Sequence, residues 1–150
     1  MIEELIVLAG ELARQDGEAA RRRAVSTLYY AYFHALAKLC ADVLAPMAPA
    51  GDYAKVYRCI DHGPAPNAFE QFARERGHVA LVDAAITFRS LQSERHKADY
   101  MPERADFLPQ KIEEWIDRVS NALVTIDRLA PADRRSLAIA LCFPQRKSLK

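Results

Sequence analysis

The sequence has little of the features that mark several common protein classes. It contains only five glycines in 150 residues, and its formal net charge is +1. The scarcity of glycine argues against a low-complexity chain, and the near-zero charge gives no general attraction to a polyanion. Contact with nucleic acid therefore needs a local basic patch, although such runs are most often solvated surface. The candidate patches are 21–23, 134–135 and the tail 146–150.

Cysteine is also scarce, and its spacing shows neither a disulfide framework nor a metal site. Cys40, Cys59 and Cys142 lie far apart, without CxxC spacing, among apolar residues. We expect all three in the core. Walker, dinucleotide, HExxH and nucleophile-elbow motifs are absent as well, so we expect no metal and no cofactor.

Long hydrophobic runs are missing too. No stretch reaches the roughly 18 apolar residues that a membrane span needs, so we expect no membrane partner. The amino terminus, 1–5, is acidic where a signal peptide is basic. We therefore expect a cytoplasmic protein.

Hydrophobic periodicity predicts helices along the chain and no strands. A length of 150 residues fits one domain with a sizeable core. The predicted fold is all-α, a single antiparallel bundle of four to five helices with short accessory helices. In the sixth predicted helix, Asp106 is the expected N-cap and Pro109 lies in the first turn. The predicted helices cover about 2–14, 18–44, 52–60, 68–76, 79–100, 106–129 and 131–141.

The predicted helix 18–44 has apolar side chains around a wide arc, which is typical of a central helix covered by its own bundle on one side and open to a second subunit on the other. Tyr29 and Phe33 belong to this arc, where a core or dimer-surface role is commoner than a ligand cage. Tyr30 and His34 are candidate ligand-binding residues on the remaining polar arc. That arc comprises Arg23, Thr27, Tyr30, His34 and Lys38.

The predicted helix 79–100 carries an arginine on its apolar face. Burying an unpaired guanidinium costs several kcal/mol, so Arg95 should be paired, and Asp99 one turn later is the nearest carboxylate. We expect a Tyr or His from the polar arc of helix 18–44 to complete the hydrogen bonds of Arg95. Such a pair is more often structural than catalytic. The apolar face comprises Leu81, Ala84, Phe88, Leu91 and Ala98.

Arg89, His96 and Tyr100 form a neighbouring stripe on the same helix. Arg89 and His96 are two turns apart, about 10 Å along the axis. If two subunits bring their stripes together, the paired side chains can cleave RNA without a metal. Histidine transfers protons in this reaction, and arginine stabilises the charge of the phosphorane. The spacing also arises by chance, so a structural role stays open. His62 is a further candidate, with a turn or cap role as its alternative, and His78 is expected at the surface.

Two segments of the sequence are distinctive, RAVSTLYYAYFHAL at 23–36 and LQSERHKADY at 91–100, and YRCIDHG at 57–63 lies between them. Together they resemble the HEPN domain, the higher-eukaryote and prokaryote nucleotide-binding helical bundle, and the likeness covers about 18–141. It implies an antiparallel bundle that dimerises through its central helices. Many members are metal-independent ribonucleases of toxin-antitoxin, phage-defence or CRISPR systems.

The family's nuclease site is an arginine followed, after four to six residues, by a histidine, and it is duplicated across the dimer. Arg89 and His96 fit this pattern at its upper limit. The commoner nuclease form has a tyrosine two residues after the histidine, whereas here Tyr100 follows after four. The chain is therefore nearer to members with an Arg-x-x-Ala-Asp-Tyr motif, which has no established nuclease role. In these, Arg95 is the matching arginine and Arg89 is incidental.

The leading prediction is a homodimeric HEPN-like protein of a prokaryotic toxin-antitoxin or defence system that acts on or binds RNA or nucleotides. Its cleft is lined by His96, Arg95, Arg89, Tyr100 and His62. As a ribonuclease, it uses His96 as base or acid, an arginine for the phosphorane, Tyr100 for orientation and Asp99 to hold Arg95. The alternative is a non-catalytic module that binds a nucleotide or a partner, for example a nucleotidyltransferase antitoxin. A purely structural helical dimer is the third reading.

Overall fold

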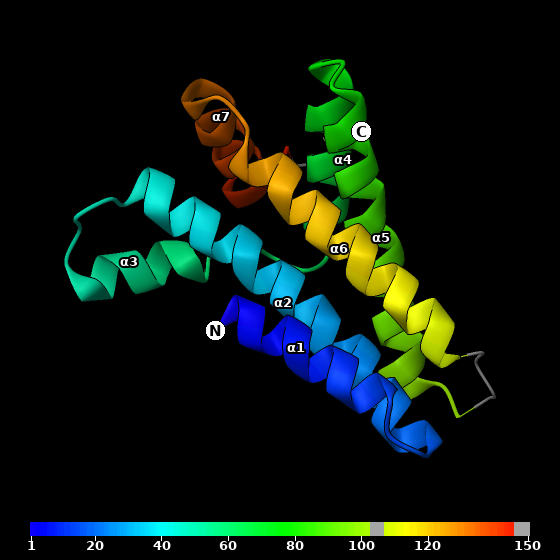
Figure 1. Ribbon diagram of the computed structural model, residues 1–150. Helices are drawn as coiled ribbons and strands as arrows, with labels where there is room; N and C mark the ends of the chain where they lie inside the picture. Colours follow the sequence, from blue (N-terminus) through cyan, green and yellow to red (C-terminus); the bar gives the residue numbers. More distant parts are fainter. Residues whose placement is uncertain (103–106, 146–150) are drawn as a thin grey trace, which may run out of the picture.

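The computed structural model describes residues 1–102 and 107–145. Within these ranges the chain forms seven helices and no strand, which confirms the all-α prediction (Figure 1). No helix in the described ranges has the length and apolarity to cross a membrane. The helices are α1 (Ile2–Ala13), α2 (Glu18–Leu44), α3 (Ala50–Tyr57), α4 (Ala65–Glu75), α5 (Val79–Tyr100), α6 (Pro109–Asp127) and α7 (Pro131–Cys142).

The two long helices α2 and α5 begin and end where the periodicity predicts. α3 and α4 begin earlier than predicted because Pro49 and Pro64 are their N-caps, and the fixed φ of proline suits a helix start. α6 begins at Pro109 with Leu108 as its N-cap. The predicted N-cap Asp106 lies outside the described residues.

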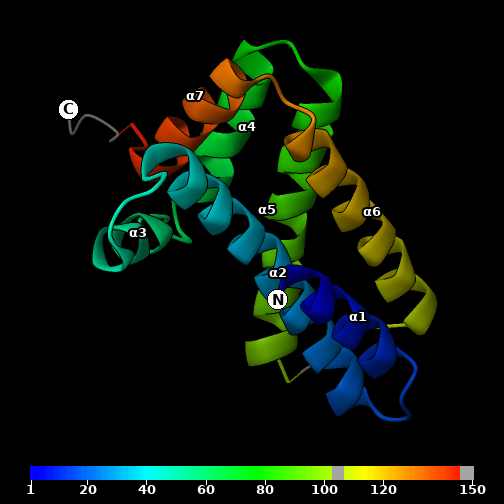
Figure 2. The ribbon, with the colours of Figure 1, turned by 60° about the vertical axis from the view of Figure 1, so that its left-hand side comes forward.

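α2 is the central helix, as its wide apolar arc predicts. It contacts α1, α3, α5, α6 and α7 (Figures 1 and 2). The chain itself therefore supplies neighbours for most of its surface. Thr27, predicted on the polar arc, is only 8% exposed and belongs to the buried part. Tyr30 and Lys38 stay exposed, whereas His34 is half-buried.

Aromatic side chains join α2 to α5. The Phe88 ring stacks on Tyr29, with ring centres 5.8 Å apart, and lies 5.1 Å from the ring of Tyr32. The Tyr32 hydroxyl donates a hydrogen bond of 2.7 Å to the carbonyl oxygen of Ala84. Each aromatic pair contributes about 1 kcal/mol beyond the burial of its area. The two helices that carry the predicted site are thereby held in one register.

The three cysteines are free thiols, and the structure places both Cys40 and Cys59 beside Cys142. Cys40 and Cys142 are buried, as predicted, and Cys59 is half-buried. The Cys59 thiol donates to the carbonyl oxygen of Cys142 at 3.4 Å. Burial raises the pKa of the Cys59 thiol to about 11, so at neutral pH it stays protonated.

Arg22 of α2 closes the carboxyl end of α5. Its Nη1 donates to the carbonyl oxygens of Lys97, Ala98 and Met101 at 3.1, 3.0 and 2.6 Å. Glu18, one turn earlier, accepts from the Nε and Nη2 of Arg22 at 3.1 and 3.0 Å. The last carbonyl oxygens of a helix have no hydrogen-bond donor within the helix, and they carry the negative end of its dipole. A guanidinium supplies both the donors and a positive charge. This contact fixes the ADY end of α5 against α2.

We expect Arg22→Gln to lower the free energy of unfolding by about 2 kcal/mol, because the charge-assisted bonds to the end of α5 are lost. Urea denaturation measures this change. Arg23→Gln, at the exposed neighbouring position, should change it by less than about 0.5 kcal/mol. Equal losses in the two variants would contradict the capping role.

Candidate functional site

The structure brings four of the eight predicted site residues together where α2, α5 and the segment before α4 meet. Tyr29, which the sequence placed in the core, joins them. We call this set the arginine–tyrosine cluster. Its members are Tyr29, Tyr30, His62, Arg95 and Asp99.

Arg95 is the centre of the cluster. Its guanidinium carbon lies 5.0 Å from the centre of the Tyr29 ring and 5.8 Å from that of Tyr30. Its Nη1 donates to Asp99 at 3.4 Å and to the Tyr30 hydroxyl at 3.5 Å. The side chain is 15% exposed. The predictions that Arg95 lies on the core side and pairs with Asp99 and a tyrosine of α2 are therefore confirmed.

Arg95 has more donors than partners. A guanidinium carries five N–H donors, yet both hydrogen bonds of Arg95 come from Nη1 and both are long. Its Nε is buried without a partner among the described residues, and Nη2 makes no hydrogen bond with them. Unused donors on a largely buried cation are costly. Arg95 is thus held mainly by the tyrosine faces and keeps hydrogen-bonding capacity for another group.

His62 lies beside Arg95 and is fixed on three sides. Its ring stacks on Phe33 with ring centres 4.0 Å apart, and its Nδ1 is 2.6 Å from the Tyr29 hydroxyl. Its carbonyl oxygen accepts a bond of 2.8 Å from Gln92 of α5. Burial raises the pKa of Tyr29, so its hydroxyl stays protonated. Nδ1 of His62 is engaged by this hydroxyl, whereas Nε2 makes no hydrogen bond with the described residues.

The pKa of His62 lies below its ordinary value. Burial is the main cause, the positive charge of Arg95 adds to it, and the nearby carboxylate of Asp61 opposes it. The ring is therefore neutral at pH 7, with its proton-transfer chemistry available in mildly acidic solution.

The second arginine–histidine pair of α5 has separate partners within the described protomer. Arg89 forms an ion pair with Glu70 of α4, which also accepts from Arg74 at 3.1 Å. His96 is exposed, and its ring centre lies 5.2 Å from that of Tyr100, which is 67% exposed. A site made of Arg89 and His96 therefore needs one of two changes. Either Arg89 leaves Glu70, or a second subunit completes the site.

His34 belongs to another part of the molecule. Although it follows Tyr30 by one helical turn, its Nδ1 lies 2.7 Å from the hydroxyl of Tyr57 on α3. It is joined there by the Lys38–Asp42 ion pair one turn further along α2. The predicted ligand-binding residue His34 thus lies outside the arginine–tyrosine cluster.

Two roles escaped the sequence analysis. Tyr29 and Phe33 of α2 hold His62, which no local pattern indicates because His62 lies on a segment far from α2 in sequence. His78 is exposed as expected, but it is also the N-cap of α5, where its Nδ1 accepts from the backbone N–H of Leu81 at 3.1 Å. Histidine is an uncommon N-cap, so composition gave little signal for it.

No family model, no curated protein and no solved structure matches the chain. Within the described ranges, no group of three or more His, Cys, Asp and Glu side chains is placed to hold a metal ion. The cluster's own groups define its chemistry: a guanidinium with unused donors, exposed and half-buried rings, and a neutral imidazole. Guanidinium pairs with phosphate, aromatic rings stack on bases, and imidazole transfers protons.

We expect Arg95→Gln to raise the pKa of His62 towards the ordinary histidine value of about 6.5, because a nearby positive charge is removed. The imidazole signals in an NMR pH titration report this pKa. Arg89→Gln removes an equal charge whose partner is Glu70, and it should leave the titration of His62 unchanged. An unchanged His62 titration in Arg95→Gln would show that the two side chains do not interact.

Proposed function

We propose that this chain is a homodimeric HEPN-like protein that binds RNA or nucleotides at the arginine–tyrosine cluster. The observation that supports the proposal best is Arg95, held on the faces of Tyr29 and Tyr30 with Nη2 unused. Such an arginine is pre-organised for the phosphate group, to which guanidinium forms strong, directed hydrogen bonds.

The neighbouring rings favour a nucleic acid ligand over a simple anion. Tyr30 is 38% exposed, and the half-buried His62 lies 6.5 Å from it, measured between ring centres. Unpaired RNA bases stack on exposed aromatic side chains. Asp99, which also accepts from Ser26 at 3.4 Å, holds Arg95 only weakly and can be displaced by a phosphate.

The homodimer is part of the same proposal. At the end of α5, next to the cluster, Tyr100 is 67% and Met101 44% exposed. Aromatic side chains and methionine are enriched at protein interfaces, and a second subunit packed here places two clusters near each other. The toxin-antitoxin or defence setting stays a prediction from the family resemblance.

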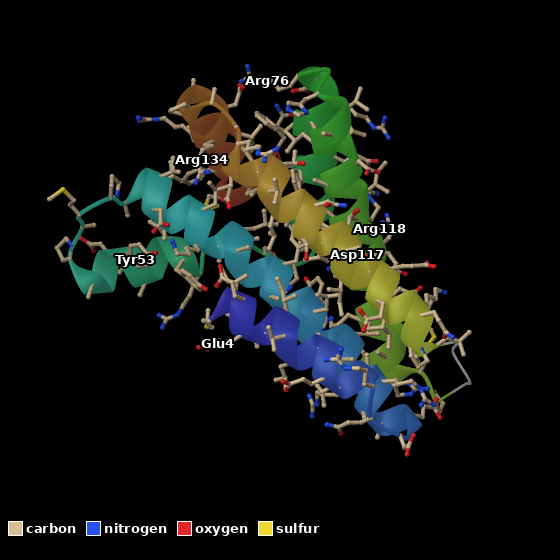
Figure 3. The ribbon with its side chains drawn as sticks, viewed as in Figure 1. Glu4, Tyr53, Arg76, Asp117, Arg118 and Arg134 are labelled. Carbon is tan, nitrogen blue, oxygen red and sulfur yellow. The ribbon has the colours of Figure 1, made fainter. Side chains whose placement is uncertain are left out.

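Fluorescence anisotropy with labelled single-stranded RNA in EDTA tests the binding site. We expect Arg95→Gln and Tyr30→Ala each to weaken binding at least about tenfold, because a phosphate contact or a stacked base is lost. Arg118→Gln is the matched control: Arg118 also lies over an aromatic ring, 4.4 Å from the centre of Trp115, but on α6 (Figure 3).

Wild-type affinity in both cluster variants, or an equal loss in Arg118→Gln, would contradict the site. Sedimentation velocity at the concentrations used for binding tests the assembly separately. A species with the mass of one chain alone, 16.9 kDa, would rule out the homodimer.

A metal-independent ribonuclease is the second candidate, favoured by a neutral histidine beside an arginine. In this reaction a base takes the proton of the 2′-hydroxyl, whose oxygen attacks the phosphorus. The bond from phosphorus to the 5′-oxygen breaks, and an acid protonates that oxygen. The products are a 2′,3′-cyclic phosphate and a 5′-hydroxyl. The neutral imidazole of His62 suits the base, and His96 is the exposed alternative.

The nuclease candidate predicts RNA cleavage in EDTA with cyclic-phosphate ends. It also predicts a loss of at least about a hundredfold in His62→Asn or His96→Asn, as expected for a lost acid or base. His78→Asn is the control, because asparagine is a good N-cap and preserves the start of α5. Absent cleavage, or equal rates in all three variants, would count against catalysis without affecting the binding proposal.

A further inference from the structure

A cavity of about 480 Å³ lies on the side of α2 that carries Lys38 and Asp42. Five helices surround it. Figure 3 labels Tyr53 on α3 and Arg134 on α7, both near the carboxyl-terminal half of α2. The lining residues come from the start of α1 (Met1, Ile2, Glu3), from α2 (Ala35, Lys38, Leu39, Asp42), from α3 (Tyr53, Tyr57), from the end of α6 (Leu123, Ile126, Asp127) and from α7 (Arg134).

The wall formed by α3 is held by few core contacts, those of the partly buried Val56 and Tyr57. All eight residues of α3 are described, and none of them is buried. The helix packs on α2 and projects from the rest of the bundle (Figures 1 and 2). Two hydroxyl groups tether it: Tyr53 donates to Asp42 at 2.7 Å, and the Tyr57 hydroxyl lies 2.7 Å from Nδ1 of His34. An eight-residue helix is marginal alone, and its two tyrosine rings line open space.

The opposite wall has unused donors. Arg134 caps α6 through Nη1, which donates to the carbonyl oxygens of Ile126 and Asp127 at 3.4 and 3.2 Å. Its Nε and Nη2 make no hydrogen bond with the described residues, and its side chain is 27% exposed. Lys38 has one partner, Asp42, whose second oxygen is taken by Tyr53. Nη1 also lies 3.8 Å from the carboxylate of Asp127, so the Nε–Nη2 edge is the part of Arg134 that a ligand can use.

The charges around this edge limit the ligand's own charge. Nε and Nη2 form a planar fork that matches the two oxygens of a carboxylate. Three carboxylates, those of Glu3, Asp42 and Asp127, also line the cavity. They disfavour a doubly charged phosphate more than a singly charged acid. The apolar floor of Ala35, Leu39, Leu123 and Ile126 suits a flat ring.

We infer that this cavity binds a small aromatic carboxylate, with its ring beside Tyr53 and Tyr57 and its carboxylate on Arg134 and Lys38. A volume of about 480 Å³ falls within the range of small-molecule sites. The site shares no residue with the arginine–tyrosine cluster, so it stands whether or not the chain binds RNA.

Isothermal titration calorimetry with indole-3-acetate as the probe tests the inference on the whole chain. We expect indole and acetate alone to bind at least about tenfold more weakly, because each supplies only one half of the recognition. The NMR signals of the Tyr53 and Tyr57 rings should shift as indole-3-acetate is added. AMP is titrated in parallel as a phosphate ligand. Tighter binding of AMP than of indole-3-acetate would overturn the choice of a carboxylate.

Two variants locate the ligand by different means. Ala35→Leu fills the apolar floor without removing a polar contact and should abolish binding. Arg134→Gln should weaken binding at least about tenfold through loss of the fork. Arg135→Gln, at the adjacent exposed position, and Arg95→Gln in the arginine–tyrosine cluster are the controls that should bind as wild type.

The inference is wrong if indole-3-acetate fails to bind, or if it binds equally to Ala35→Leu and Arg134→Gln. It is also wrong if Arg95→Gln abolishes binding, because the ligand then occupies the arginine–tyrosine cluster. Urea denaturation of each variant identifies any that fails to fold. If one does, the other variant and the shifts of the tyrosine rings decide the outcome.

Discussion

The guanidinium of Arg95, taken almost entirely out of water, is the constraint around which α2 and α5 are arranged. A buried cation needs compensation, and two tyrosine faces and one distant carboxylate supply it here. Tyr29 and Tyr30 are adjacent in sequence, so placing both rings against Arg95 fixes the rotation of α2. Tyr29 then stacks on Phe88 and binds His62, which ties the core, the cation and the segment before α4 into one unit.

This arrangement leaves Arg95 less well hydrogen-bonded than it could be, and the unused donors remain open to a ligand. A tighter Asp99 pair would satisfy Arg95 better, yet both of its hydrogen bonds are long. Burial, together with the same charge, lowers the pKa of His62 and keeps that ring neutral. Structural groups that are fully satisfied have little to offer a ligand, whereas Arg95 retains unused donors and His62 retains a ring nitrogen without a hydrogen bond to the described residues. Perturbed and under-bonded groups of this kind are commonest at functional sites.

The fold was predictable because helical periodicity reports on each segment alone. The bounds of α2 and α5 follow from prolines, glycine and the apolar arc, and the pairing of Arg95 with Asp99 follows from one turn of helix. The remaining contacts depend on which elements pack together. The distance between Tyr29 and His62, the Glu70 partner of Arg89 and the turn of Thr27 into the core arise from tertiary packing. No one-dimensional pattern contains that information.

The tethering of α3 has a consequence for how the molecule opens. Local unfolding needs only as much free energy as the contacts that it breaks. For α3 these are two tyrosine hydrogen bonds and the packing of the partly buried Val56 and Tyr57, whereas α2 and α5 share stacked aromatic rings. Backbone amides of α3 therefore exchange with solvent through a local opening that leaves the bundle intact. A helix that opens in this way also forms one wall of the cavity lined by Tyr53 and Tyr57.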